Sequence, residues 1–449
     1  MKKFSLNKTG EHIFFSKFIF SLITACVDCV HFFHPAQRAL RHATRQRINR
    51  SINPEKELRT FLEQIKDVPY YKDIIVNNDI DIKATDIYAE MSKFPLLTRE
   101  EIISNYDNII NTDYKGKTKM VGSSGTTATS LVCPVPVERY TKLAATWQRS
   151  WMSLGIKFNS WMVWFGGKVI IPIERTHGPY YKVNLTMKRV MFSAFHLTAE
   201  TIHEYHQSLK QMPIEWIHGH AHNIVLLATL ITENKLEKLG HIKFITTGAD
   251  SLFDWQRKLI QEAFPNAIIR QVYGLTEGVA SICEDINGEL KVDEDFAYTE
   301  FIPLDENNPD LCKIVGTGFN NPAFPMIRYE TGDLATVKTD ENGVRHILQI
   351  DGRTVDSIKL PNGRRISSTS MTNFEYTQQV KEVQFYQEDL YNIYVRIVRR
   401  PGYDEEEEKK VIASIRERLP QEVQIHLEYV DKIERTKNGK IRYIISNIK

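Results

Sequence analysis

Several features that mark particular classes of protein are scarce or missing in this 449-residue sequence. Its cysteines are few, odd in number and widely spaced, which indicates no disulfide framework and favours a reducing compartment. Positive charge is not in excess, because 58 Lys and Arg face 56 Asp and Glu, so we predict no nucleic-acid partner. There is no internal repeat or low-complexity tract. The cysteines are Cys26, Cys29, Cys133, Cys283 and Cys312.

A long hydrophobic run is also missing near the start of the chain. Lys17 leaves only residues 18–27 as an uncharged apolar stretch, about half of what a bilayer span requires. We therefore expect residues 1–54 to form an amphipathic helical extension, docked on the protein body or in peripheral contact with a partner or membrane surface. Cys26 and Cys29 have no second pair at zinc spacing, so we assign no metal to them. Without a span or an export signal, the chain is expected in the cytoplasm.

The remaining sequence has an ordinary globular composition, with 42% hydrophobic and 25% charged residues, and its length favours at least two domains. From about residue 55, helical patterns alternate with short apolar runs bounded by Gly, Pro and Asn, which predicts an α/β fold. Strands are predicted at residues 161–165, 243–247 and 267–273, and helices at 224–239 and 253–263.

A domain boundary is predicted near Gly352, where a strand-like run gives way to a glycine-bearing segment able to hinge. This boundary separates a large domain, residues 55–351, from a small α+β domain, residues 352–449. The small domain is predicted to contain strands at 383–386, 391–398 and 423–430 and a helix at 405–418 whose acidic start is solvated.

The first chemical signal is the loop at residues 120–127, Met-Val-Gly-Ser-Ser-Gly-Thr-Thr. Glycines let the backbone approach an anion closely, and the hydroxyls and N–H groups can donate hydrogen bonds to phosphate. It is not a Walker loop, because no Gly-Lys-Ser/Thr follows. By itself, such a Ser/Thr/Gly stretch is more often a plain surface loop.

The second signal is residues 273–277, Tyr-Gly-Leu-Thr-Glu, at the carboxyl end of a predicted strand, the edge where α/β sheets usually bind ligands. There Tyr273 could stack on a base, Thr276 could contact a phosphate or carboxylate, and Glu277 could hold Mg²⁺. A third stretch, residues 328–333, ends in Asp333, which could accept from two ribose hydroxyls. Residues 352–356 and 434–440 complete the set, and each stretch alone also fits an ordinary turn.

In this order, the five stretches resemble the signature motifs of the adenylate-forming superfamily, which includes acyl-coenzyme A synthetases and luciferases. The residues of these motifs and their spacing are most similar to the phenylacetate–coenzyme A ligase-like family, especially its branch found with capsular and other surface-polysaccharide genes. This resemblance extends from about residue 58 to the end. Residues 68–71, 192–197, 247–250 and 360–366 also look like that branch. The resemblance implies a large N-terminal adenylate-forming domain with β-sheets and flanking helices, followed by a small C-terminal lid.

The resemblance also implies two half-reactions, in which a carboxylic acid or amino acid and ATP form an acyl adenylate and a thiol or amine then displaces AMP. Mg²⁺ and, as acceptor, coenzyme A are expected. The implied nucleotide-binding residues are Ser123, Ser124, Gly125, Thr126 and Thr127 for the β- and γ-phosphates, Gly248, Ala249, Tyr273 and Gly274 for the adenine side, and Asp333 and Arg353 for ribose and phosphate. The implied catalytic residues are Lys440, Thr276 and Glu277, with Glu277 as the Mg²⁺ ligand. The implied acyl pocket contains Phe195, His196, Gly219 and His220.

Departures from the family pattern leave alternatives open. Val355, followed by Asp356, stands at the hinge where relatives carry an acidic residue or Lys, and Asp250 replaces a longer glutamate. His218, His220 and His222 would share one face of a strand, which fits a metal site, a polar acyl pocket or ordinary hydrogen-bonded histidines. Two further functional alternatives are acyl transfer to an amine or carrier protein in surface-polysaccharide or natural-product synthesis, and a non-catalytic nucleotide-binding assembly protein.

Overall fold

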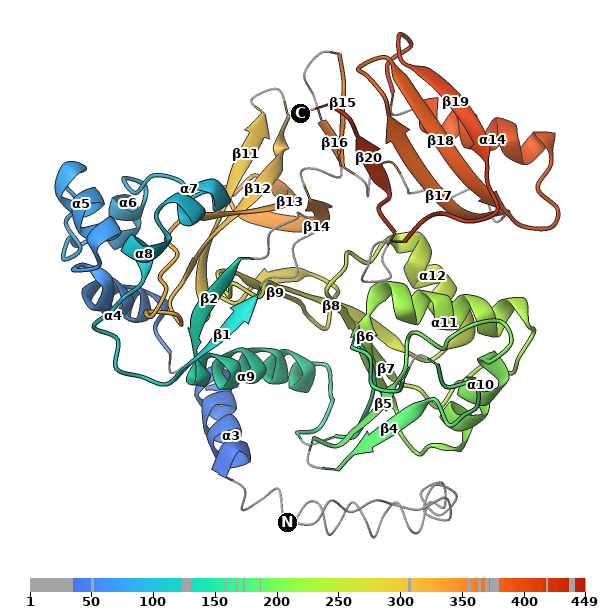
Figure 1. The fold of residues 1–449 in the computed structure, drawn as a ribbon, viewed down its shortest axis with the longest axis horizontal. Helices are drawn as coiled ribbons and strands as arrows, with labels where there is room; N and C mark the ends of the chain where they lie inside the picture. The colour runs from blue at the N-terminus through green and yellow to red at the C-terminus, as the bar shows by residue number, and fades with distance from the viewer. Residues whose placement is uncertain are drawn as a thin grey trace. The chain divides into compact units, whose positions relative to one another are not determined.

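The computed structural model describes residues 35–49, 52–122, 131–158, 160–166, 168–172, 174–185, 187–305, 308–353, 357–361, 365–367, 371, 379–416, 419–435 and 441–448 (Figure 1). The chain divides into two compact units: residues up to 51 with 144–252 and 256–272, and residues 52–143, 253–255 and 273–449. No helix in the described part is long and apolar enough to cross a membrane.

The first unit is built on a mostly parallel sheet with the strand order β8-β7-β6-β3-β5-β4. Strands β8, β7, β6, β3 and β5 run parallel to their neighbours, and β4 pairs antiparallel with β5. The strands are β3 (Met162–Phe165), β4 (Tyr181–Asn184), β5 (Arg189–Phe192), β6 (Trp216–His220), β7 (Phe244–Gly248) and β8 (Ile268–Gly274). Because β6, β7 and β8 are parallel, their carboxyl ends meet at one edge of the sheet.

The helices that lie wholly or mostly in this unit are α3 (Pro35–Ile48), α9 (Val137–Ser153), α10 (Ile202–Gln211), α11 (Ala221–Glu233) and α12 (Asp254–Ala263). Helix α11 is apolar on most sides, so it is buried along most of its length. In α3, the buried Arg47 side chain donates to Thr146 Oγ1 at 2.9 Å, so this part of the N-terminal extension is docked on the body. Residues 1–34, the first part of the predicted extension, lie outside the described residues, so its predicted peripheral contact with a partner or membrane surface stays a prediction.

The second unit contains a run of antiparallel strands in the order β11-β12-β13-β14-β10-β9. These strands are β9 (Ser281–Glu284), β10 (Leu290–Val292), β11 (Ala297–Asp305), β12 (Asn308–Gly318), β13 (Tyr329–Thr339) and β14 (Arg345–Arg353). A separate antiparallel hairpin is formed by β1 (Thr118–Gly122) and β2 (Val132–Pro136). The helices are α4 (Pro54–Ile65), α5 (Pro69–Asn77), α6 (Ile87–Met91), α7 (Arg99–Ser104) and α8 (Tyr106–Ile109).

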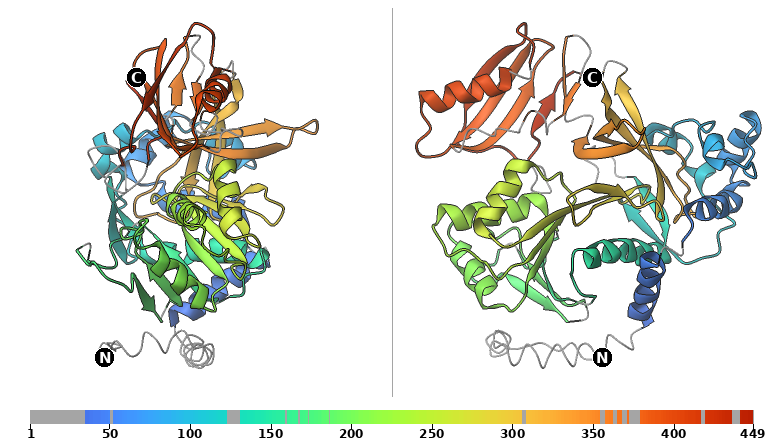
Figure 2. Two further views of the ribbon diagram at one scale, coloured as in Figure 1. Left: turned by 90° about the vertical axis from the view of Figure 1, so that its right-hand side faces the viewer. Right: turned by 180° about the vertical axis from the view of Figure 1, so that it is seen from behind.

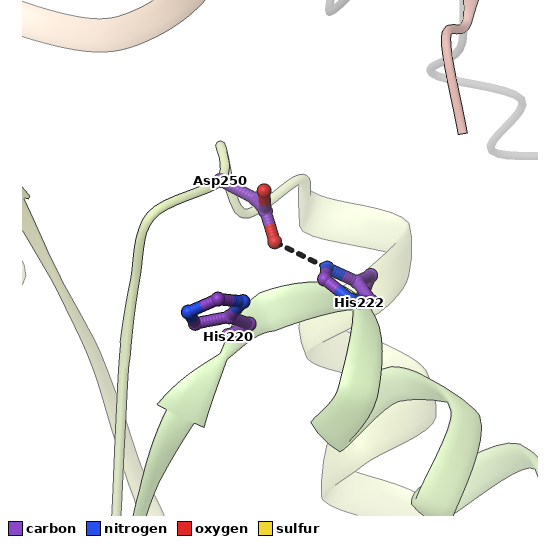
Figure 3. A group of neighbouring side chains, drawn as sticks. All are labelled: His220, His222 and Asp250. Carbon is purple, nitrogen blue, oxygen red and sulfur yellow. Dashed lines mark hydrogen bonds and ion pairs between the residues drawn. The ribbon is translucent and has the colours of Figure 1, made fainter. Parts of the chain in front are cut away.

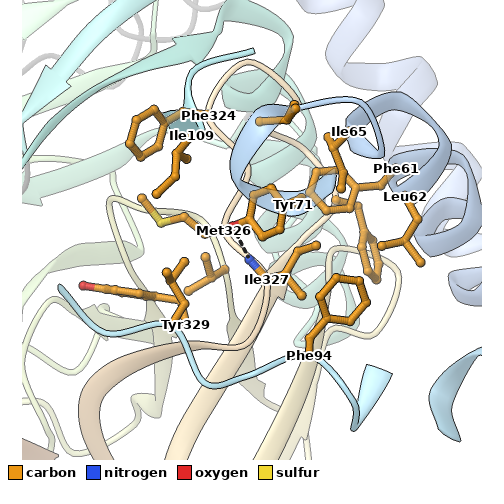
Figure 4. Close-up of a cluster of buried hydrophobic side chains, with 14 of the residues drawn as sticks. Phe61, Leu62, Ile65, Tyr71, Phe94, Ile109, Phe324, Met326, Ile327 and Tyr329 are labelled. Carbon is orange, nitrogen blue, oxygen red and sulfur yellow. Dashed lines mark hydrogen bonds between the residues drawn. The ribbon is translucent and has the colours of Figure 1, made fainter. Parts of the chain in front are cut away.

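A buried hydrophobic cluster joins these helices to the segment between β12 and β13 (Figure 4). Helix α4 begins with a proline directly after Asn53, and the Asn53 side chain accepts the Lys56 N–H at 3.0 Å and so caps the helix. The apolar face of α4 contributes Phe61 and Leu62 to the cluster. The buried Tyr71 hydroxyl donates to the Pro325 carbonyl at 2.9 Å, which satisfies its polar end inside the apolar core.

The C-terminal part has its own sheet, in the order β19-β18-β17-β20, and its own hydrophobic cluster. Helix α14 packs on one face of this sheet through Val411 and Ile415 (Figure 2). Asp404 caps the first turn of α14 by accepting from two backbone N–H groups, and the glutamates there favour the helix start. The elements are β15 (Ser357–Lys359), β16 (Arg365–Ser367), β17 (Val380–Gln387), β18 (Asn392–Arg399), α14 (Glu405–Arg416), β19 (Gln424–Tyr429) and β20 (Ile444–Ser446).

The predicted α/β fold with a smaller C-terminal lobe is confirmed, and the predicted strands match β3, β7 and β8 within a residue or two. The helix predicted at 224–239 is α11, which begins at Ala221 and ends at Glu233. It ends early because Lys235 adopts a left-handed φ of 51°, which turns the chain although the apolar spacing continues to the buried Leu239. The exact boundary near Gly352 stays a prediction.

Candidate active site

Tyr273 and Asp333, which come from two different motifs, meet in the second unit. Tyr273 lies at the end of β8, and its hydroxyl donates to Asp333 Oδ2 at 2.8 Å. Burial, reinforced by the negative charge of Asp333, raises the pKa of Tyr273 well above its ordinary value, so the phenol stays protonated and remains a donor. An aromatic ring and a carboxylate are therefore held side by side.

The backbone around Asp333 explains its position on β13. Gly332 adopts a left-handed φ of 77°, and the Thr331 hydroxyl accepts the Asp333 N–H at 3.1 Å and donates to the Ile314 carbonyl at 2.8 Å. Asp333 is paired in the β13–β14 ladder with Arg353. Two residues that the sequence resemblance assigned to ribose and phosphate are thus direct neighbours across a strand pair.

The turn after Tyr273 is held by a residue that the motifs did not include. Arg139, which is only 4% exposed, donates through Nη1 to the Glu277 carbonyl at 2.6 Å and through Nη2 to the Thr276 carbonyl. The next residue, Gly278, has a left-handed φ of 70°, and a Cβ there would lie 2.8 Å from Arg139 Nη1. Arg139 and Gly278 together fix the backbone that carries Thr276 and Glu277, whose side chains are partly exposed.

The predicted phosphate loop and the predicted catalytic lysine belong to two further motifs. Residues 123–127 and Lys440 lie outside the described residues. The strands on either side of the loop are described, and they form the β1–β2 hairpin, in which Gly122 pairs with Val132. The assignment of the loop and of Lys440 to phosphate stays a prediction.

In the first unit, Gly248 ends β7 and Ala249 follows with a left-handed φ of 67°, uncommon for alanine. Gly219 lies inside β6, where a Cβ would come within 2.3 Å of the Phe165 carbonyl oxygen, so a larger residue does not fit. Gly219 therefore has a local structural reason that is independent of any ligand pocket.

The remaining predicted pocket residues differ in environment. Phe195 is 39% exposed, whereas His196 is 8% exposed and its Nδ1 lies 2.7 Å from the Ser193 hydroxyl. The His196 ring stacks on Tyr180 at a centroid distance of 5.1 Å. His196 is thus a packed, hydrogen-bonded histidine, and its role in an acyl pocket stays a prediction.

The expectation that three alternating histidines share one strand face is wrong for His222. Strand β6 ends at His220, and His222 lies in the first turn of α11, where the period of two no longer applies. His218 lies 2.8 Å through Nδ1 from Thr246 Oγ1 and packs edge-on against Trp151, and burial lowers its pKa to about 3. His220 and His222 instead lie near Asp250, beyond the end of β7.

A cavity of about 810 Å³ in the second unit contains none of the predicted site residues. It is lined by residues of β10, β11 and β14, including Tyr298 and Arg345. The chemistry-bearing motifs, rather than this cavity, therefore define the candidate site.

Most of the chain is similar in sequence and in fold to several known proteins. Residues 358–447 match the family model described as the CapK C-terminal domain. Protein CapK of Staphylococcus aureus is 27% identical over 393 residues, covering 86% of each chain. The structure of 2-hydroxyisobutyryl-CoA ligase in the postadenylation state with R3-HIB-AMP matches with a TM-score of 0.66 at 16% identity, over 88% of this chain and 89% of that one. The anthranilate CoA ligase AuaEII with anthranoyl-AMP matches with a TM-score of 0.54 at 15% identity, over 74% and 67%.

The chain has the fold of the adenylate-forming ligases. This is the fold that the resemblance of the five motifs implied. Within the adenylate-forming fold, Arg139 is the residue of the candidate site that sequence reasoning missed. It lies 138 positions before Glu277, and the sequence around it, Val-Glu-Arg-Tyr at the start of α9, resembles any amphipathic helix.

Proposed function

We propose that this protein is an ATP-dependent carboxylic acid ligase that forms an acyl adenylate and transfers the acyl group to a thiol, with coenzyme A as the expected acceptor. The Tyr273–Asp333 pair at the end of β8 is the observation that supports this most directly. An adenine base can stack on the ring of Tyr273, and ribose hydroxyls can donate to the Asp333 carboxylate. The adenylate-forming fold supports the same conclusion.

In the first half-reaction, one oxygen of the acid's carboxylate bonds to the α-phosphorus of ATP while the bond from that phosphorus to the departing pyrophosphate breaks. Two anions must approach each other, and charge accumulates on the phosphoryl oxygens. Lys440 is the residue expected to stabilise this charge, with the hydroxyls and N–H groups of residues 123–127 holding the β- and γ-phosphates.

Glu277 is the residue expected to hold Mg²⁺. The carboxylate of Glu277 offers oxygen ligands, which Mg²⁺ prefers. Arg139 binds the backbone carbonyl of Glu277 and not its carboxylate, so this contact leaves the carboxylate to the metal ion. When bound, Mg²⁺ supplies neutralisation of phosphate charge. The protein residues orient the nucleotide through Tyr273 and Asp333 and hold the turn that presents Glu277.

In the second half-reaction, a thiolate sulfur bonds to the acyl carbon, the bond to the AMP oxygen breaks with its electron pair, and the thiol proton goes to solvent. Coenzyme A as acceptor is supported by two structural neighbours, which are named as CoA ligases. Those neighbours hold acyl–AMP compounds of a hydroxy acid and of anthranilic acid, so a small organic acid or amino acid is the substrate class we propose here.

A second acceptor class is favoured by a different observation. The chain matches Protein CapK over most of its length and carries a CapK C-terminal domain, and its motifs resemble the branch found with surface-polysaccharide genes. These likenesses support transfer of the acyl group to an amine or a carrier-protein thiol during surface-polysaccharide assembly.

The test is pyrophosphate release and hydroxamate trapping with ATP, Mg²⁺ and a panel of aryl, acyl, hydroxy and amino acids, with and without coenzyme A. We expect at least one acid to release pyrophosphate and to yield a hydroxamate, and coenzyme A to replace hydroxylamine as acceptor. Acid-dependent pyrophosphate release that coenzyme A does not accelerate favours the amine or carrier alternative. Failure of every acid, together with ATP binding that remains intact, favours the non-catalytic alternative.

A further inference from the structure

We propose that His220, His222 and Asp250 form a binding site for one divalent transition-metal ion, with Zn²⁺ the best match. Each residue offers one ligand atom, and these atoms all lie within 4.8 Å of one another. Figure 3 shows the two imidazole rings at the junction of a strand and a helix and the Asp250 carboxylate on a separate segment beside them. Within the part of the chain that the structure describes, this is the one such group of three His, Cys, Asp or Glu residues.

The sheet of the first unit positions the three side chains. Strands β6 and β7 are parallel neighbours, and the last residue of each, His220 and Gly248, are paired in the ladder. Helix α11 starts directly after His220, which brings His222 back over the strand end, while the left-handed Ala249 turns the chain so that Asp250 follows two residues after Gly248. The group is therefore held by two strand ends and a helix start rather than by a long loop.

The donor set is that of a transition-metal site. Two imidazole nitrogens and one carboxylate oxygen are typical ligands of Zn²⁺ and of related ions, whereas Mg²⁺ prefers oxygen alone. Three protein ligands leave a further position for an oxygen of water or of a small molecule. The site thus differs in chemistry and in residues from the Mg²⁺ assignment to Glu277.

Burial and contacts fit an ion-binding role. The side chains of His222 and Asp250 are 22% and 17% exposed, so an ion could reach them while being partly shielded from solvent. His222 Nδ1 lies 2.5 Å from Asp250 Oδ2, and the rings of His220 and His222 lie 5.5 Å apart between centroids. An ion bound by both residues of the His222–Asp250 pair replaces the proton between them, so only a small adjustment of the side chains is needed.

The chain offers a matched control in the second unit. His346 Nε2 lies 3.0 Å from Asp340 Oδ2, and within the described residues this pair belongs to no group of three potential metal ligands. A His–Asp pair alone should bind Zn²⁺ weakly. The inference does not depend on adenylate formation, because it concerns binding of the metal ion alone.

The experiment titrates the full-length protein, freed of metal by a chelator, with Zn²⁺ by calorimetry and with Co²⁺ by visible absorption. The protein carries Cys26→Ser and Cys29→Ser, which remove a competing thiol pair. We expect one saturating equivalent and cobalt d–d bands without a thiolate charge-transfer band. His220→Ala and Asp250→Asn should each weaken Zn²⁺ binding at least about 10- to 100-fold, while His346→Ala should leave it unchanged.

Thermal unfolding keeps the test decisive if a variant is destabilised. Zn²⁺ should raise the melting temperature of the parent protein and of His346→Ala, but not that of Asp250→Asn, which retains the size of the side chain. The proposal is overturned if the parent shows no saturable Zn²⁺ binding, or if His220→Ala and Asp250→Asn bind Zn²⁺ as tightly as the parent. A thiolate charge-transfer band would also overturn it, because it would place the ion on one of the remaining cysteines.

Discussion

Replacing Asp333 by alanine is expected to weaken ATP binding. The substitution removes the carboxylate that we assign to the ribose hydroxyls, and a hydrogen bond to a charged group contributes about 1.5–3 kcal/mol. That free energy corresponds to a roughly 10- to 150-fold higher dissociation constant. Water can occupy part of the space left by the carboxylate, so the lower end of this range is expected.

The Tyr273 contact supplies the internal control for this prediction. Tyr273 donates to Asp333 Oδ2, but a carboxylate has about four acceptor sites, so this one bond does not use up its acceptor capacity. Tyr273→Phe keeps the ring face for stacking and should change ATP affinity by less than about threefold. Tyr273→Ala removes the ring and should cost about 1–3 kcal/mol of binding free energy, the usual value for stacking of one base.

Calorimetric titration with ATP and with 2′,3′-dideoxy-ATP measures the ribose interaction directly. The wild-type protein and Tyr273→Phe should bind ATP about tenfold or more tightly than the dideoxy analogue, whereas Asp333→Ala should bind the two almost equally. Melting temperatures serve as the folding control. If Asp333→Ala loses ATP affinity but still discriminates against the dideoxy analogue, Asp333 acts on the fold and is not the ribose acceptor.

Four further predictions concern other parts of the chain. Arg139→Met leaves the Thr276 and Glu277 carbonyls without their donor, so it should lower the free energy of unfolding by about 1.5–3 kcal/mol in urea titrations and slow pyrophosphate release. Lys440→Ala should slow pyrophosphate release by about 10²–10³ yet still convert supplied acyl adenylate; equal loss in both assays would contradict a role limited to the first step. Limited proteolysis should cut at residues 352–365, more slowly with an adenylate analogue present; a resistant segment would argue against a hinge. Burial and the charge of Arg189 lower the pKa of His218 from 6.5 to about 3. As the pH falls from 6.5 towards 3, the unfolded chain therefore binds a proton at His218 before the folded protein does, and the free energy of unfolding decreases by up to about 1.4 kcal/mol per pH unit. His218→Asn should remove this contribution, which denaturation at pH 7 and at pH 5 measures.

Much of the fold could be predicted from local pattern. Buried parallel strands such as β3, β7 and β8 are short apolar runs closed by glycine or proline, and that signal does not depend on distant residues. The three-residue strands β10, β15, β16 and β20 were not predicted, because so short a run shows no alternation of apolar and polar residues. Such a run is a strand only because it pairs with a neighbouring strand. Helix α11 was predicted in the right place, but its predicted end lay too far along the chain. The left-handed conformation of Lys235 that ends the helix does not change the spacing of the apolar residues.

The candidate site was predictable where its residues fall inside a motif. Tyr273 and Asp333 were each assigned from a short stretch, and the structure adds that they touch. Arg139 could not be found in this way, because its partners are backbone carbonyls. Every residue has a backbone carbonyl, so no residue type in the sequence marks the partner. A buried arginine near the start of a helix is the only available signal, and burial itself requires the fold.

The histidine stretch shows how one wrong assumption about secondary structure changes the chemistry. On an uninterrupted strand, His218, His220 and His222 would form a row of three imidazoles on one face. His218 instead forms a buried hydrogen bond with Thr246 on the neighbouring strand. The transition to a helix after His220 leaves His222 to meet Asp250, 28 positions further along the chain. A carboxylate replaces the third imidazole, which changes the expected ligand set from three nitrogens to two nitrogens and one oxygen. Since only the pairing of β6 with β7 brings Asp250 to this place, the sequence could suggest a metal but could not name its third ligand.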